Sequence, residues 1–175
     1  LVYLGRLHPI KGIENLLHAV ALTDRTVELS IFGDGESGYR ESLEMLARQL
    51  KIEDRVTFCG QIDKDDLKDE IFFAADLVIA PSFSEAFCMV VAEALAHGVP
   101  VIASTGTPWK QVEALGCGLW VNNDPQTLAA AIEKAKSLPL AAMGERGRQW
   151  MKEEYSWSSV AYRMATKYWQ AIANH

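Results

Sequence analysis

The chain has 175 residues, of which 49% are hydrophobic and 23% charged, and its mean hydropathy is close to zero. This length and composition are typical of one globular domain, and they argue against collagen-like, low-complexity and membrane-spanning classes. The net charge of −6 and the pI of about 5.2 argue against a broad nucleic-acid surface, although a few cations can still be focused on one small anion.

Short apolar runs alternate with segments of helical spacing along the chain. Strands are expected at residues 1–5, 27–33, 56–60, 76–81, 99–103 and 119–122. Most of these runs are continuously apolar, which is typical of a parallel sheet covered on both faces. A first residue inside a predicted strand suggests a piece of a longer polypeptide.

Helices are expected at residues 13–21, 39–50, 64–74, 89–97 and 126–137, with a short helix after Trp109 and a long amphipathic helix after an N-cap at Ser156. This order predicts a doubly wound, Rossmann-like α/β domain over residues 1–175. We expect a mainly parallel sheet of about six strands with helices on both faces. Ligands of such domains bind where the strands end, so the residues after each strand are the candidates.

The three cysteines, Cys59, Cys88 and Cys117, are sparse and lack the spacing of metal ligands. An odd and scattered set of this kind predicts reduced, mostly buried thiols in a cytoplasmic protein.

Two cations follow the first predicted strand. Arg6 and Lys11 flank the start of a helix, where positive charge opposes the helix dipole. A bound anion would reverse that disadvantage, because the free N–H groups of a helix start favour negative charge. The alternative is a solvated loop, and His8 is expected to be a loop residue rather than a catalytic one.

Residues 33–38 satisfy the pattern G-x-G-x-x-G after the second predicted strand. The pattern suggests a dinucleotide-binding site, but that fingerprint belongs to the first strand of the fold, and no acidic residue ends the next strand. We therefore expect a glycine turn whose backbone can approach a ligand phosphate. Asp34 and Glu36 are interpreted as turn residues rather than as a metal-binding pair.

Two acidic residues follow the fourth predicted strand. Glu85 lies in the loop, and Glu93 lies in a helix that is otherwise apolar. A carboxylate on such a helix needs hydrogen-bond donors, which sugar or ribose hydroxyls would supply. The alternative is a pair of capping or surface carboxylates. Trp109, after the fifth strand, either lines a pocket or packs in the core.

Together these residues resemble the carboxyl-terminal, donor-binding domain of retaining GT-B glycosyltransferases, the group 1 family. The resemblance rests on Gly5-Arg6, Lys11-Gly12, the Gly33-Asp34-Gly35 turn, and Glu85 with Glu93 spaced as E-x7-E. Residues 107–109 and 117–120 are similar to a bacterial branch that builds lipopolysaccharide or capsule. Ala86 and Cys88 depart from the family, which commonly has glycine at the first of these positions and glycine or proline at the second. Gln111 replaces a frequent glutamate.

The resemblance implies a role for each candidate residue. Arg6 and Lys11 would bind the donor diphosphate, together with the backbone after Phe87 at Cys88 and Met89. Glu93 would hold the ribose hydroxyls, Gly35 would lie in the glycine turn beside the donor, and Ile62 would border the nucleobase. Glu85 would be the catalytic residue, in contact with the transferred sugar near its anomeric carbon.

The resemblance also implies an activity. A hexosyltransferase-type enzyme would pass sugar from a nucleotide sugar, such as a UDP- or GDP-sugar, to a saccharide or lipid-linked acceptor with retention, in cell-surface polysaccharide synthesis. We expect no metal or other cofactor, because cations and helix amides can stabilise the leaving diphosphate. No nucleic-acid partner is expected.

In this family the acceptor site lies in an amino-terminal domain that these residues do not include. We therefore expect the isolated chain to bind a donor without transferring sugar, and its terminal helix to be exposed or to self-associate. A full-length enzyme is expected in the cytoplasm, at the inner face of the membrane. Two alternatives stay open, a GT-B-fold nucleotide-sugar epimerase and a non-catalytic nucleotide-sugar binding module.

Overall fold

The computed structural model describes residues 1–36, 38–62 and 65–173. At its centre is a six-stranded sheet in the order β3-β2-β1-β4-β5-β6, and every neighbouring pair is parallel. The strands are β1 (Val2–Leu4), β2 (Leu29–Phe32), β3 (Val56–Gly60), β4 (Val78–Ala80), β5 (Val101–Ser104) and β6 (Gly118–Val121). The strand order reverses between β1 and β4, and the crevice at such a point is the usual ligand site of an open α/β sheet.

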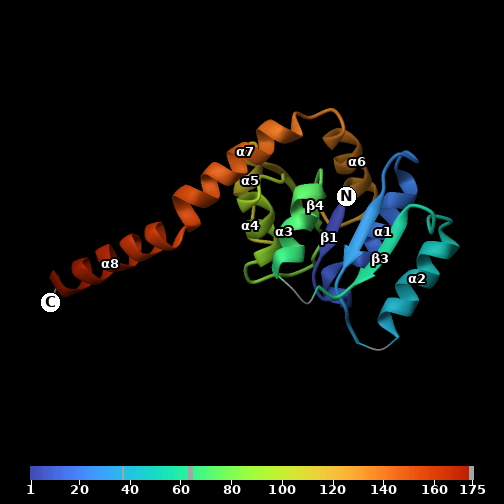
Figure 1. The fold of residues 1–175 in the computed structure, drawn as a ribbon, viewed down its shortest axis with the longest axis horizontal. Helices are drawn as coiled ribbons and strands as arrows, with labels where there is room; N and C mark the ends of the chain where they lie inside the picture. The colour runs from blue at the N-terminus through green and yellow to red at the C-terminus, as the bar shows by residue number, and fades with distance from the viewer. Residues whose placement is uncertain (37, 63–64, 174–175) are drawn as a thin grey trace.

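Helices cover both faces of the sheet (Figure 1). One face carries α1 (Ile13–Leu22), α2 (Tyr39–Gln49) and α6 (Pro125–Ala135). The other carries α3 (Asp65–Ala74), α4 (Met89–Ala96), α5 (Gln111–Ala114) and α7 (Leu140–Trp150). The predicted doubly wound α/β architecture is therefore confirmed. Lys64, with which the third predicted helix begins, lies outside the described residues.

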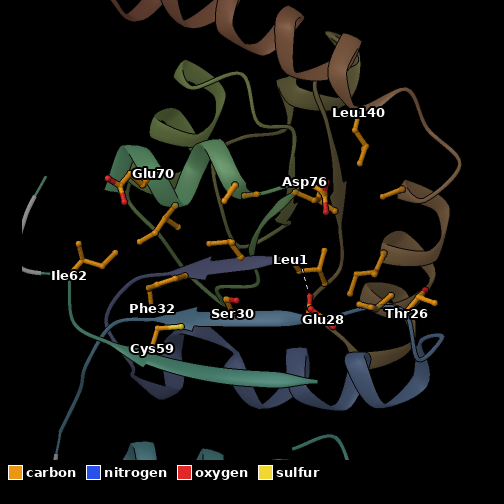
Figure 2. A pocket seen from close by; sticks show the side chains of 18 of the residues that line it. Leu1, Thr26, Glu28, Ser30, Phe32, Cys59, Ile62, Glu70, Asp76 and Leu140 are labelled. Atoms are coloured by element: carbon orange, nitrogen blue, oxygen red, sulfur yellow. Dashed lines mark hydrogen bonds between the residues drawn. The ribbon is translucent and has the colours of Figure 1, made fainter. Parts of the chain in front are cut away.

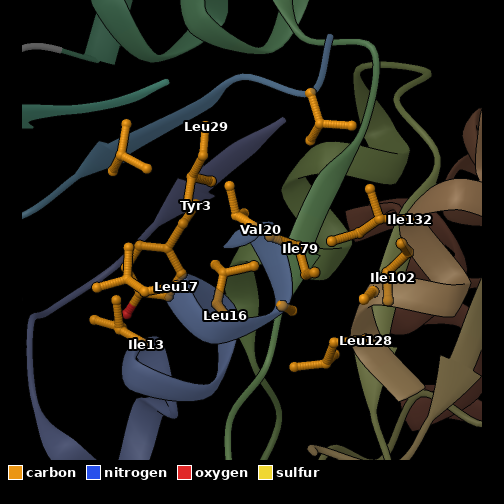
Figure 3. Close-up of a cluster of buried hydrophobic side chains, with 14 of the residues drawn as sticks. Tyr3, Ile13, Leu16, Leu17, Val20, Leu29, Ile79, Ile102, Leu128 and Ile132 are labelled. Carbon is orange, nitrogen blue, oxygen red and sulfur yellow. The ribbon is translucent and has the colours of Figure 1, made fainter. Parts of the chain in front are cut away.

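Alternating strand residues divide the core into two layers. In β1, Tyr3 packs on the face that carries α1, and Val2 packs on the opposite face. In β4, Ile79 lies on the face of α1 and Val78 on the opposite face. Figure 3 shows the first layer, in which strand residues meet the apolar stripe of α1 and two residues of α6; its labelled members are Tyr3, Ile13, Leu16, Leu17, Val20, Leu29, Ile79, Ile102, Leu128 and Ile132. Burial on both faces explains why the strands are continuously apolar.

The apolar spacing of residues 140–150 does not predict helix α7. Two glycines interrupt its pattern, but both lie where the helix approaches α4 most closely. A Cβ added to Gly144 would lie 1.7 Å from the carbonyl oxygen of Gly98, and one added to Gly147 would lie 2.6 Å from Leu95. The glycines therefore allow α7 to pack closely against the end of α4. Helix α7 continues into one π-helical turn, η2 (Met151–Tyr155).

The last helix, α8 (Trp157–Ala173), extends away from the body of the domain (Figure 1). Its large apolar side chains are mostly exposed, with Trp157 90% and Trp169 72% accessible. This agrees with the expectation that the terminal apolar stripe lies exposed. None of the described helices is both long and apolar enough to cross a membrane.

Candidate functional site

The loops that follow β1 and β2 run side by side in close backbone contact, with a parallel bridge between Leu7 and Gly35. The amide of Leu7 donates to the carbonyl oxygen of Asp34 over 2.8 Å. A Cβ at Gly33 would lie 1.9 Å from the Gly5 carbonyl oxygen, and one at Gly35 would lie 2.1 Å from that of Leu7. The glycines at 33 and 35 are thus required by the close approach of two parallel loops, a reason that the sequence alone did not reveal. Ser37 of that pattern lies outside the described residues.

The segment between β1 and α1 begins with a short 3₁₀ helix, η1 (Pro9–Lys11). His8 caps it, since its Nδ1 accepts a hydrogen bond from the Ile10 amide over 3.2 Å. His8 is therefore a capping residue of this loop, and its expected lack of a catalytic role stays a prediction. Gly12 adopts a left-handed conformation with φ 67°, and a Cβ there would lie 2.2 Å from the carbonyl oxygen of Pro81. The loop after β1 and the loop after β4 therefore lie against each other at the carboxyl edge of the sheet.

Lys11 and Glu85 form an ion pair at this edge. Lys11 Nζ lies 2.5 Å from Glu85 Oε1, and the two side chains are only 22% and 14% exposed. The Ser82 hydroxyl donates to the same oxygen over 2.8 Å. Burial by itself raises the pKa of Glu85, but the hydrogen bonds from Lys11 and Ser82 outweigh it and lower the pKa below its ordinary value. Glu85 is therefore a carboxylate at neutral pH.

Helix α4 begins beside this pair. Its N-cap residue, Cys88, adopts a left-handed conformation with φ 68°, and no side chain caps the first turn. The orphan N–H groups of that turn are available to an anion. Burial, followed by the nearby charge of Glu85, raises the pKa of Cys88 to about 12, so its thiol is neutral. Glycine adopts φ > 0 without strain, whereas other residues do so uncommonly.

Glu93 lies one turn further along α4 and is also paired. Lys68 Nζ of α3 donates to Glu93 Oε1 over 2.6 Å, and the two side chains are 31% and 28% exposed. The sequence reading expected ligand hydroxyls to supply the donors that this carboxylate needs. In the structure Lys68 supplies one. The sequence reading did not single out Lys68, because a lysine on an amphipathic helix has no local signature of a site.

These groups line two adjoining cavities at the switch point. One, of about 630 Å³, is bordered by the loops after β1 and β2; it includes Gly5, Arg6, Gly35, Gln61, Ile62 and Lys68. The other, of about 380 Å³, lies against the start of α4; it includes Gly5, Lys11, Lys68, Glu85, Cys88, Met89 and Glu93. Gly5 and Lys68 border both. We call the two together the edge cavities.

The structure thus gathers eight of the nine candidate site residues around the edge cavities. The exception among the described residues is the ninth, Phe87, whose ring packs on Trp109 at a centroid distance of 5.0 Å. Trp109 is 2% exposed and also contacts Trp150 and Tyr155. Trp109 therefore packs in the core. Its indole N–H donates to the Phe87 carbonyl oxygen, which anchors the loop that leads into α4.

A larger cavity, of about 870 Å³, lies beside the edge cavities and shares Phe32, Gln61 and Ile62 with the first of them (Figure 2). It runs between α3 and strands β1 and β2, with Leu1 hydrogen-bonded to Glu28 at its floor. Its lining is mainly aliphatic, and the acidic side chains Glu28, Glu70 and Asp76 border it. Lys136, the one lysine in that lining, is already paired with Asp24 and Glu133 outside it. This arrangement disfavours an anion, whereas the edge cavities offer Arg6 and the start of α4.

Within the described part of the chain, no three histidine, cysteine or acidic side chains come together as a metal site. Asp34 Oδ1 accepts a hydrogen bond from the Gly35 amide over 2.8 Å. That contact is in keeping with its interpretation as a turn residue.

Comparison with known proteins bears directly on this arrangement. The model of the family described as Glycosyl transferases group 1 matches residues 1–150. The chain belongs to this family. A relative, the D-inositol 3-phosphate glycosyltransferase of Mycolicibacterium vanbaalenii, is 31% identical over 99% of the chain. The match covers 41% of that relative, so the group 1 chain spans less than half of its length.

Solved structures agree with the family. Sucrose-phosphate synthase of Thermosynechococcus elongatus superposes with a TM-score of 0.84 at 32% identity, over 99% of this chain and 45% of that one. HepE of Anabaena, in complex with UDP-glucose, superposes with a TM-score of 0.84 at 25% identity, over 97% of this chain and 48% of that one. The group 1 fold expected from the sequence is therefore present in this chain.

Proposed function

We propose that this group 1 chain binds the nucleoside diphosphate of a nucleotide-sugar donor in the edge cavities. The observation that carries the proposal is the meeting of Arg6, Lys11 and the uncapped start of α4 at one end of the sheet. Cations and free helix amides are the groups that bind phosphate oxygens. The UDP-glucose complex of the similar HepE structure supports this choice of ligand.

The same groups fit the chemistry of glycosyl transfer. When the bond between the anomeric carbon and the diphosphate breaks, negative charge grows on the leaving oxygens, and positioned cations and amides stabilise it. Arg6, Lys11 and the amides at Cys88 and Met89 would do this without a metal ion. Ionised Glu85 would lie beside the positive charge that develops on the sugar ring. We propose retention of configuration as the outcome.

We propose further that the acceptor site belongs to a second domain. The chain covers 41% of the Mycolicibacterium relative, and Glu85 is held by Lys11 at the open edge of the sheet. On this proposal the 175-residue chain binds donor but does not transfer sugar. A longer enzyme would serve a saccharide or lipid-linked acceptor at the inner face of a bacterial membrane, in lipopolysaccharide or capsule synthesis.

Calorimetric titration tests the donor site. UDP, GDP and ADP are titrated into the chain in the presence of EDTA, and at least one is expected to bind. Each charge-assisted hydrogen bond is worth about 1.5–3 kcal/mol, so the double variant Arg6→Ala, Lys11→Ala should weaken binding by roughly tenfold or more. A matched loss of two charges, Arg25→Ala with Lys136→Ala, should leave binding unchanged.

Three results would contradict the proposal. Failure of UDP, GDP and ADP alike to bind the wild-type chain would leave no donor site. Unchanged affinity in the Arg6 and Lys11 double variant would show that these two cations do not bind the nucleotide. Binding that disappears in EDTA and returns with manganese would show that a metal is needed, and Asp34 and Glu36 would then be the first ligands to test.

A further inference from the structure

Lys68 is a third cation of the edge cavities. It projects from α3, borders both cavities, and holds the carboxylate of Glu93 at 2.6 Å. Lys68 has no role in the proposed function, which assigns roles to Arg6, Lys11, Glu85 and Glu93. Its position between the two cavities makes it a neighbour of any ligand that occupies both.

Helix α3 is fixed against α4 by contacts close to Lys68. Phe72, one turn further along α3, is fully buried and stacks on the His97 ring at a centroid distance of 4.8 Å. His97 Nε2 lies 2.9 Å from Asp69 Oδ1, and its Nδ1 lies 2.7 Å from the backbone carbonyl oxygen of Glu93. Residues four apart share a helix face, so the anchored face of α3 also presents Lys68 to α4.

The charge balance of the cavities explains why a cation is needed there. A nucleoside diphosphate is an anion, and an unpaired carboxylate beside it would repel it in a partly buried site. Glu85 is already paired with Lys11. Glu93 has Lys68 as the corresponding partner. An ammonium group has three donors, so Lys68 can hold Glu93 and still donate to a ligand.

We propose that Lys68 is a positioning residue of the donor site. It neutralises Glu93 and fixes its carboxylate, so that this group can accept hydrogen bonds from ligand hydroxyls while a diphosphate lies nearby. The inference rests on the proposed donor-binding function. It adds a residue on α3 to a site otherwise built from the loops after β1, β2 and β3 and from the loop and helix after β4.

The test is a double-mutant cycle read by calorimetry, with whichever of UDP, GDP and ADP binds the wild-type chain most tightly. Lys68→Met should weaken binding by about tenfold, and Lys68→Arg should restore most of that loss because it keeps the charge. In a Glu93→Gln background, Lys68→Met should cost much less, since there is no charge left to neutralise. Lys136→Met, a matched lysine at the larger cavity, should have no effect.

The outcomes separate the two proposals. If none of the three nucleotides binds the wild-type chain, the proposed function fails. If a nucleotide binds but Lys68→Met leaves its affinity unchanged, the role of Lys68 fails. The role also fails if Lys68→Met lowers the affinity as much in the Glu93→Gln background as in the wild type. If Lys68→Met lowers thermal stability, Lys68→Arg decides, because failure of a stable arginine variant to restore affinity overturns the role assigned to the charge.

Discussion

Glu85 and Glu93 are the two carboxylates of one cavity, but they are held in different ways. Glu85 lies in a loop and is bound by Lys11 and Ser82. Glu93 lies within α4 and is bound by Lys68 from a neighbouring helix. The sequence could indicate both acidic residues, because each follows the same strand in a recognisable spacing. It could not indicate that Lys11 and Lys68 would pair with them, since these lysines come from segments 74 and 25 residues away.

Neutralising the two carboxylates should therefore have different effects on nucleotide binding and on turnover. Glu93→Gln should weaken binding of the bare nucleoside diphosphate and of its sugar conjugate alike, by about 1.5–3 kcal/mol if a charged hydrogen bond to the ribose is lost. Glu85→Gln should spare the bare nucleotide and mainly lower turnover in a longer, active enzyme. Calorimetry with both ligands measures the difference. Equal losses of bare-nucleotide affinity in the two variants would show that the roles are wrongly assigned.

At the scale of elements, the strands and most helices could be predicted because periodicity and burial act locally. Helix α7 could not, since Gly144 and Gly147 lower its helix propensity and their function appears only once α4 is packed against them. Arg146 and Arg148 of the same helix donate to the carbonyl oxygens of Gly116 and His97. The helix is thus specified by tertiary contacts at the ends of α5 and α4.

Gly144→Ala tests this account of α7. Glycine to alanine normally stabilises a helix interior by about 0.5–1 kcal/mol. Here the new Cβ meets a backbone oxygen at 1.7 Å, so we expect destabilisation of about 1–3 kcal/mol, the usual range for overpacking. Urea denaturation measures it, with Ala142→Ser at an exposed position of α7 as the control. A Gly144→Ala variant as stable as the wild type would contradict the packing described.

Helix α8 is the element with the least support from the rest of the chain. Isolated helices of its length are marginal in water, and its aromatic residues, such as Tyr168 and Trp169, are 61% and 72% exposed. In a monomer, we expect amides of residues 160–172 to exchange hydrogen much faster than those of α1. Concentration-dependent association through this face is the alternative outcome, detected by light scattering. A monomer with a strongly protected α8 would contradict the exposed helix.

At the scale of the whole molecule, the domain offers two neighbouring places for a ligand, which share Phe32, Gln61 and Ile62 but differ in charge. The larger cavity beneath α3 is mainly aliphatic and bordered by Glu28, Glu70 and Asp76. The edge cavities lie at the switch point of the sheet, where Arg6 and the start of α4 favour an anion. A nucleotide-sugar donor is therefore expected to bind at the edge cavities rather than in the larger one.

Amide chemical-shift mapping tests this claim most directly. A ¹⁵N-labelled chain is titrated with UDP, GDP and ADP, and the amide signals that move are assigned. If the donor binds at the edge cavities, the largest shifts fall on the loops after β1 and β2 and on the start of α4, at residues such as Arg6, Gly35 and Met89. Shifts confined to the larger cavity, at residues such as Ala74 and Ala135, or no shifts with any of the three nucleotides, would contradict it.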